Sequence, residues 1–146
     1  MKGKKILVTG GAGFIGSHIV ESLVHREAQI SVFDNFSTGS TENLSNVLSN
    51  ITVIRGDILD FKALKDAMRD IDIVSHHAAQ LEVIRGMEDS RFDLQVNTMG
   101  TLNVLRAARE NNIKKLIFAS SSAVYGQSNG LTSEKQYPHP NWTYGV

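Results

Sequence analysis

The chain has 146 residues, of which 41% are hydrophobic and 21% are charged, and this fits one globular domain with a packed core. Fifteen basic residues balance fifteen acidic ones, so the net charge gives no reason to expect binding to nucleic acid or to an anionic membrane. Cysteine is absent, which excludes a disulfide scaffold and a catalytic thiolate, and no apolar run approaches the roughly 20 residues of a membrane-spanning helix.

Short apolar runs alternate with segments of helical spacing along the chain. Strands are predicted at 6–8, 30–33, 51–54, 71–74 and 116–119, helices at 14–24, 61–68 and 91–110, and a short helix at 41–48. Strands that are apolar on both faces and separated by helices indicate a parallel sheet with helices on each side. Because crossovers are right-handed, we expect an α/β fold with a Rossmann-type doubly wound sheet of order 3-2-1-4-5, in one domain spanning 1–146.

A glycine-rich turn joins the first predicted strand to the first helix. Gly10, Gly13 and Gly16 have the spacing of a phosphate-binding turn and stand in the strand–helix context that such a turn requires. Gly10 permits a tight turn, Gly13 lets the backbone approach a pyrophosphate, and Gly16 lets helix and strand pack closely. The free N–H groups around Phe14 and Ile15 then favour a bound negative charge. An ordinary strand–helix turn is the alternative interpretation.

An acidic residue, Asp34, ends the second predicted strand. A carboxylate here can accept hydrogen bonds from both ribose hydroxyls of an adenosine, and it repels a 2′-phosphate, so it favours NAD over NADP. A turn or helix-capping aspartate is the alternative. The loop continues with small residues that can hydrogen-bond a cofactor, and these are Asn35, Ser37, Thr38 and Gly39.

Six motifs in one order run through the chain. They are Thr9–Gly16, Asp34–Gly39, Gly56–Ile58, His77–Gln80, Asn97–Thr101 and Ser120–Gly126. Together they resemble the extended short-chain dehydrogenase/reductases that act on nucleotide sugars, and within that family the NAD-dependent UDP-glucose 4-epimerase branch. The resemblance covers essentially the whole chain as an amino-terminal portion. It implies that the carboxyl-terminal part, which holds the nucleotide sugar in this family, is absent.

The resemblance also implies further contacts to NAD. Asp57 would hydrogen-bond the adenine amino group and Ile58 would cover the ring. Gln80 would border the sugar-nucleotide cleft, and Asn97 would order the active-site backbone. The residues expected at the pyrophosphate and the nicotinamide ribose are His77, Ala78 and Ala79, with Ser120 completing the cofactor site. From the residues alone, turn, surface and strand-end roles stay open for all of these positions.

Catalysis in this family needs a hydroxyl after the fifth strand and a tyrosine with a lysine four residues later. Ser121 matches the hydroxyl, with Ser122 beside it at the substrate, and Tyr144 matches the tyrosine. The resemblance implies that Tyr144 takes a proton from the sugar's 4-hydroxyl while hydride passes to NAD, and that Ser121 hydrogen-bonds the 4-oxygen of the resulting 4-keto sugar. The chain ends two residues before the lysine, so we expect these 146 residues alone to be inactive.

Alternative functions stay open. Dehydratases of the family place an Asp-Glu pair just after the active hydroxyl and decarboxylases keep the glutamate, where this chain has Ser122 and Ala123. This favours epimerisation, although other branches, including reductases, are compatible with the sequence. A non-catalytic NAD-sensing module would need the glycine turn and Asp34 but not Ser121 and Tyr144.

We expect no metal site, a small-molecule substrate and a second copy of the chain as partners. The pair His76–His77 does not indicate a metal site, because neighbouring residues on a strand point to opposite faces and no third ligand is evident. The resemblance implies a UDP-hexose substrate and, in the intact chain, a second copy bound through the helix near 91–110 and the helix that begins around Tyr144. We expect no nucleic-acid or membrane partner and a cytoplasmic location.

Overall fold

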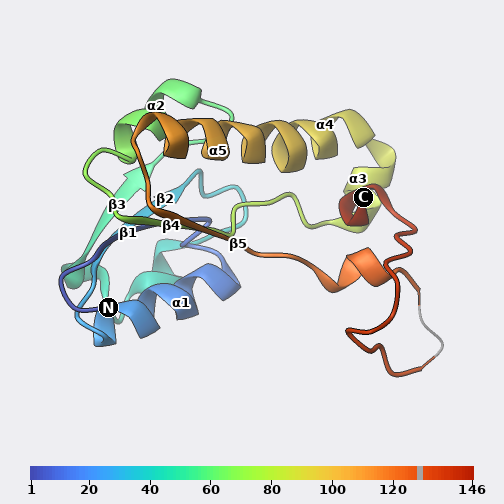
Figure 1. The fold of residues 1–146 in the computed structure, drawn as a ribbon, viewed down its shortest axis with the longest axis horizontal. Helices are drawn as coiled ribbons and strands as arrows, with labels where there is room; N and C mark the ends of the chain where they lie inside the picture. The colour runs from blue at the N-terminus through green and yellow to red at the C-terminus, as the bar shows by residue number, and fades with distance from the viewer. Residues whose placement is uncertain (128–129) are drawn as a thin grey trace. The chain divides into compact units, whose positions relative to one another are not determined.

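The computed structural model describes residues 1–127 and 130–146, and it contains a five-stranded parallel sheet (Figure 1). The strands are β1 (Lys5–Thr9), β2 (Gln29–Asp34), β3 (Ile51–Arg55), β4 (Ile73–His76) and β5 (Lys115–Phe118). They pair in the order β3-β2-β1-β4-β5. The predicted doubly wound sheet and its strand order are confirmed.

Five α-helices and several tighter or wider turns accompany the strands in the described residues. The α-helices are α1 (Phe14–His25), α2 (Phe61–Ala67), α3 (Val83–Glu88), α4 (Ser90–Leu94) and α5 (Thr101–Glu110). A π-helical segment, η3 (Gln95–Gly100), lies between α4 and α5 in the sequence, and 3₁₀ helices are found at η1 (Thr41–Leu44), η2 (Leu48–Asn50), η4 (Ser122–Tyr125) and η5 (Thr143–Gly145). None of the helices in the described part of the chain is both long and apolar enough to cross a membrane.

The residues form two compact units. The first, called here the sheet unit, comprises residues 1–78 and 100–119, and the second unit comprises residues 79–99 and 120–146. All five strands, α1, α2 and α5 belong to the sheet unit, whereas α3, α4, η4 and η5 belong to the second unit.

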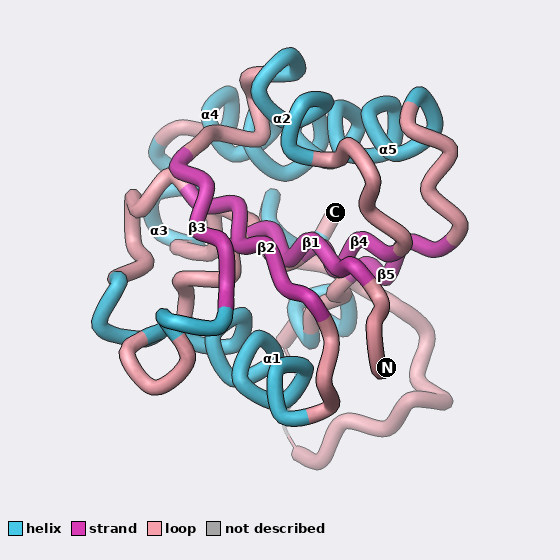
Figure 2. Tube along the Cα trace, turned by 90° about the vertical axis from the view of Figure 1, so that its left-hand side faces the viewer, coloured by secondary structure: helices cyan, strands magenta, loops and turns pink. Residues whose placement is uncertain are grey.

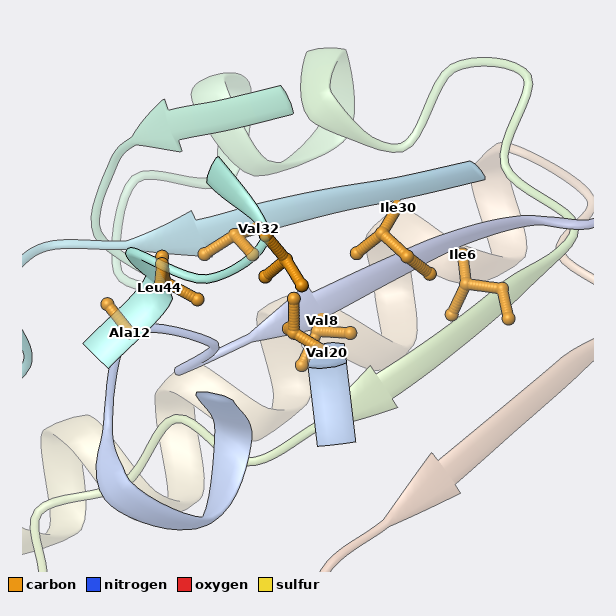
Figure 3. Packing of buried hydrophobic residues seen from close by; sticks show 8 residues of the cluster. Ile6, Val8, Ala12, Val20, Ile30, Val32 and Leu44 are labelled. Atoms are coloured by element: carbon orange, nitrogen blue, oxygen red, sulfur yellow. The ribbon is translucent and has the colours of Figure 1, made fainter. Parts of the chain in front are cut away.

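Helices cover both faces of the sheet within the sheet unit. Helix α1 lies on one face, and α2 and α5 lie on the other (Figures 1 and 2). Because successive strand residues point to opposite faces, Ile6 and Val8 of β1 join the core on the α1 side while Leu7 is buried on the other. Figure 3 shows the α1-side core, which is built from β1, β2, α1 and η1 and includes Ala12, Val20, Ile30, Val32 and Leu44.

Strand β4 extends further along the chain than its apolar run suggests. The strand predicted at 71–74 starts and ends two residues later, at Ile73 and His76. Asp72 precedes the strand, and its carboxylate and N–H both bond the backbone of Lys5. The polar residues Ser75 and His76 belong to the strand because they pair with Val8 and Thr9 of β1. Register with a neighbouring strand, rather than hydrophobicity, sets this boundary.

The helix predicted at 91–110 is not one regular α-helix. The side chain of Asp89 caps α4 by accepting the Phe92 N–H at 3.0 Å. The backbone then forms the π-helix η3 before α5 begins. The short helix predicted at 41–48 is instead the two 3₁₀ turns η1 and η2. Helix α3, which has six residues, was not predicted, and its apolar residues Ile84 and Met87 are largely exposed.

Candidate functional site

The glycine turn after β1 has the close packing that its sequence predicts. Gly10 has a φ of +67°, and a Cβ at this residue would lie 2.6 Å from the backbone nitrogen of Ala78. A Cβ at Gly16 would overlap the Gly10 carbonyl and lie 2.8 Å from the Cα of Gly11. A side chain larger than hydrogen therefore cannot be accommodated at either position without moving backbone, which is the requirement of a tight phosphate-binding turn.

The amino end of α1 is open to a ligand. Gly13 occupies the N-cap position, and no described side chain caps the helix there. A helix end without a side-chain cap leaves backbone N–H groups that can bind an anion. Phe14 and Ile15, in the first turn, are 78% and 66% exposed. The open helix end is compatible with a diphosphate, and the site stays a prediction.

Asp34 has the structural role of a turn aspartate, which was the alternative to ribose binding at this position. Its Oδ2 accepts the N–H of Ala12 at 2.9 Å, and its Oδ1 accepts the N–H of Phe36 at 2.8 Å. The carboxylate thus ties the end of β2 to the glycine turn and to its own loop. Each carboxylate oxygen has a second lone pair, so the predicted bonds to a ribose stay compatible with these contacts and stay a prediction.

The loops after β2 and β3 meet beside Asp34. Asn35 Nδ2 donates to Asp57 Oδ2 at 2.9 Å, and Asn35 Oδ1 accepts the Ser37 N–H at 3.0 Å. A Cβ at Gly39 would lie 2.9 Å from the backbone of Ala12. Within the sheet unit, the structure therefore brings the predicted adenosine-binding residues of two loops to one edge of the sheet. Thr38 lies in the same loop, without a described side-chain hydrogen bond.

Ile58 is a core residue, whereas the residues that follow β4 lie beside the glycine turn. Ile58 is almost fully buried, and its side chain fills the space that a Cβ at Gly100 would occupy. The contact to an adenine ring expected for Ile58 therefore stays a prediction. His77 and Ala78 pass next to Gly10, and both of their N–H groups approach the hydroxyl of Thr9, at 3.3 and 3.4 Å. The Thr9 hydroxyl thus supports the backbone opposite the glycine turn.

The two adjacent histidines occupy separate environments, as the strand geometry predicts. His76 is buried, and its ring nitrogens bond the hydroxyls of Thr9 (2.6 Å) and Thr101 (3.0 Å). Burial, with a smaller contribution from His77, lowers the pKa of His76 to about 4. His77 bonds Ser75 through Nε2 at 2.8 Å, its Nδ1 finds no partner in the described part of the chain, and burial lowers its pKa. No group of three metal-ligating side chains occurs among the described residues.

In the second unit, Asn97 organises the chain around Gln80. Asn97 Oδ1 accepts the Gln80 N–H and Asn97 Nδ2 donates to the Gln80 carbonyl, both at 2.9 Å. The Gln80 side chain is buried and bonds both backbone groups of Glu82, at 2.7 and 2.8 Å. Ala79 precedes this clamp. These bonds fix the backbone at Gln80. The active-site role that the resemblance implied for Asn97 and the role of Gln80 at a sugar-nucleotide cleft stay predictions.

The two predicted catalytic residues lie on two short turns that pack together in the second unit. Ser121 is half-buried and caps η4, its Oγ accepting the Ala123 N–H at 3.2 Å. Tyr144 is half-buried in η5. A Cβ at Gly145 would lie 2.5 Å from the Ala123 carbonyl, so the two turns are in close contact. Of the neighbours of Ser121, Ser120 is exposed and Ser122 is exposed as well.

Two buried residues with polar roles were missed from the sequence. His76 joins Thr9 of β1 to Thr101 of α5, and Asp93 of α4 bonds Asn97. A signal existed for each of them. Thr9 and His76 end neighbouring strands, and Asp93 stands four residues before Asn97, the spacing that places two side chains on one helix face.

Comparison with known proteins places these features in a family. The model of the NAD dependent epimerase/dehydratase family matches residues 6–146. A solved UDP-glucose 4-epimerase of Thermus thermophilus in complex with NAD is 41% identical with a TM-score of 0.87, covering 97% of this chain and 46% of that one. A UDP-N-acetylglucosamine 4-epimerase of Methanobrevibacter ruminantium is 40% identical with a TM-score of 0.88, covering 99% and 47%.

A relative with a different activity is equally similar in sequence. A UDP-N-acetyl-alpha-D-glucosaminuronate decarboxylase of Bacillus cytotoxicus is 42% identical over 131 residues, which are 90% of this chain and 40% of the relative. The chain therefore spans somewhat less than half the length of the proteins that it matches. Sequence similarity alone does not separate the epimerase branch from the decarboxylase branch.

Proposed function

The chain belongs to the NAD dependent epimerase/dehydratase family, and on this premise we propose that it is part of a UDP-sugar 4-epimerase that interconverts UDP-glucose and UDP-galactose. The observation that carries this proposal is the packing of the Ser121 turn against the Tyr144 turn in the second unit. A non-catalytic NAD-sensing module would not require these two side chains to be brought to adjacent turns.

The residues of the sheet unit fit NAD. Gly10 and Gly16 form a cradle that a Cβ would fill, the uncapped end of α1 favours the diphosphate, and Asp34 carries negative charge where the adenosine ribose is expected. Bound NAD supplies an acceptor and donor of hydride at the sugar's C4. In this proposal the chain's own residues bind and orient the cofactor through the glycine turn and hold the adenosine between the loops after β2 and β3.

The second unit supplies the acid–base chemistry in this proposal. Tyr144, as a phenolate, takes the proton of the 4-hydroxyl, and Ser121 hydrogen-bonds the 4-oxygen and passes the proton. The same proton returns to the oxygen when the 4-keto sugar is reduced on its other face, so the reaction has no net consumption of acid or base.

Two side chains favour epimerisation over dehydration and decarboxylation. Ser122 is a hydroxyl and Ala123 is apolar, so neither provides the carboxyl group that the resemblance associates with dehydration or decarboxylation. The decarboxylase relative nevertheless makes UDP-hexuronates the most informative competing substrates.

Product analysis of the full-length protein tests the proposal. It is incubated with UDP-galactose, UDP-N-acetylgalactosamine and a UDP-hexuronate, and the products are identified by NMR of their anomeric protons. We expect conversion of UDP-galactose to UDP-glucose without net change of NAD, and loss of conversion in Tyr144→Phe. Release of carbon dioxide from the hexuronate without any 4-epimer would contradict the proposal.

A homodimer and a cytoplasmic location are part of this proposal. Leu102 and Leu105 on α5 are 42% and 49% exposed, and exposed apolar residues on one helix are suited to a protein partner. Light scattering on the full-length protein tests the dimer, since a monomer at micromolar concentration would contradict it.

A further inference from the structure

One buried carboxylate, that of Asp93, lies at the centre of the polar contacts in the second unit. Asp93 is on α4, only 3% of its surface is exposed, and its Oδ1 accepts a hydrogen bond from Asn97 Nδ2 at 3.1 Å. A carboxylate only accepts hydrogen bonds, so Asp93 determines that the NH₂ end of the Asn97 amide faces it. In that orientation Asn97 Oδ1 is available for the Gln80 N–H.

The contacts then continue from Asn97 to α3. Gln80 is held by Asn97, and the Gln80 side chain bonds both the N–H and the carbonyl of Glu82. Glu82 is the N-cap residue of α3. The position of α3 therefore depends on the orientation of the Asn97 amide.

Helix α3 lies next to Asp93 at Gly86. A Cβ at Gly86 would lie 2.9 Å from Asp93 Oδ1 and 3.1 Å from Thr143 Oγ1. Gly86 is thus the point where α3, the Asp93 carboxylate and the η5 turn meet, and η5 packs against both α3 and α4. Tyr144 is the next residue after Thr143 in η5.

We propose that Asp93 is a positioning residue for Tyr144, acting through Asn97 on the start of α3 and through Gly86 and Thr143 on the turn that carries the phenol. The inference rests on the proposed catalytic role of Tyr144. Asp93 does not touch the substrate in this account. It fixes the geometry in which the phenol meets the sugar hydroxyl.

Two variants disturb this arrangement in different ways. Asp93→Ala removes the acceptor of Asn97, whereas Gly86→Ala removes no hydrogen-bonding group and pushes a methyl against Asp93 and Thr143. Since a displacement of about 1 Å in a reacting group can cost a hundredfold in rate, we expect kcat of the full-length enzyme to fall roughly 10- to 100-fold in both variants. The KM for UDP-galactose and the affinity for NAD should stay within about twofold, because binding of the ground state is not affected.

Asp89→Ala is the matched control. It removes an acidic residue from the same helix, together with the cap of α4, but leaves the Asp93 contacts intact, so its kcat should match the wild type at temperatures where it is folded. Asp93→Asn keeps one acceptor oxygen for Asn97 and should recover most of the lost kcat.

The outcomes separate the two proposals. If the wild type is active, an unchanged kcat in Asp93→Ala would overturn the positioning role alone. A loss of kcat in Asp89→Ala equal to that in Asp93→Ala would do the same. A loss of NAD affinity and a rise in KM that accompany the fall in kcat would also overturn it, because they would indicate general disruption of the fold. A wild type that converts no UDP-sugar would overturn the proposed function and this inference with it.

Discussion

The carboxylate of Asp34, at the end of β2, accepts a hydrogen bond from the backbone N–H of Ala12 at 2.9 Å, inside the glycine turn. Its other oxygen accepts the N–H of Phe36 at 2.8 Å, and only 7% of the residue is exposed. One side chain thus holds both backbone segments that would frame an adenosine. Asp34 therefore stabilises the fold at the place where the proposed function puts the adenosine ribose.

Asp34→Ala is expected to lower the free energy of unfolding by about 1–3 kcal/mol, because it leaves the Ala12 N–H without its partner. Asp34→Asn keeps one acceptor oxygen and should cost less. Urea denaturation of the purified chain measures both. Asp57→Ala is the control, since Asp57 also accepts a backbone N–H, that of Leu59, but in an exposed hydrogen bond. Equal stability of Asp34→Ala and the wild type would show that the tie to the turn is unimportant.

Gly10→Ala should abolish NAD binding, because the new methyl would collide with the backbone at Ala78. Gly3→Ala is its matched control. Gly3 has a similar φ of +71°, but no described atom lies within 4 Å of its Cβ position. Both variants carry the cost of a left-handed residue, roughly 1–2 kcal/mol, so calorimetry with NAD on the two proteins separates backbone strain from the close approach. Binding of NAD by Gly10→Ala with wild-type affinity would contradict the proposed cradle.

The stability of the protein should fall in mild acid because of His76. Its pKa is lowered from 6.5 to about 4 in the folded protein, so between these values the unfolded chain binds more protons than the folded one. The stabilisation is therefore fully present above pH 6.5 and is lost as the pH falls toward 4, by about 3 kcal/mol in total. Urea denaturation at pH values of about 7, 6 and 5 measures the slope.

Replacement of His76 identifies the source of that slope. His76→Gln can still bond Thr9 or Thr101 but does not titrate, so its stability should depend less on pH over the same range. A slope identical to that of the wild type would assign the acid sensitivity to other groups, of which His77, whose pKa burial also lowers, is the first to test.

The sheet was predictable from the sequence because its central strands are buried on both faces. Residues 6–8 and 30–33 are largely apolar runs, and alternation with helices leaves a parallel, doubly wound order as the simplest solution. The end of β4 was not predictable in this way. Ser75 and His76 are polar, and they belong to the strand only because β1 offers them backbone partners.

The candidate site was predictable where geometry demands a residue type. Glycine is needed at positions 10 and 16 because other backbone segments approach closely there. The sequence shows this requirement directly. The hydrogen bonds of Asp34 to Ala12, and of Asp93 to Asn97, depend on how loops and helices come together in three dimensions. The spacing of Asp93 and Asn97 puts both side chains on one helix face, but it does not distinguish a buried carboxylate from an exposed one. The burial of Asp34 and Asp93 therefore required the structure.

Calorimetric titration of the full-length protein, freed of endogenous nucleotide, with NAD and with NADP tests the central claim most directly. We expect one NAD to bind per chain, and NADP to bind about a thousandfold more weakly, because a 2′-phosphate about 4 Å from the Asp34 carboxylate would be repelled by roughly 4 kcal/mol. Failure to bind NAD, or equal affinity for the two dinucleotides, would contradict the account.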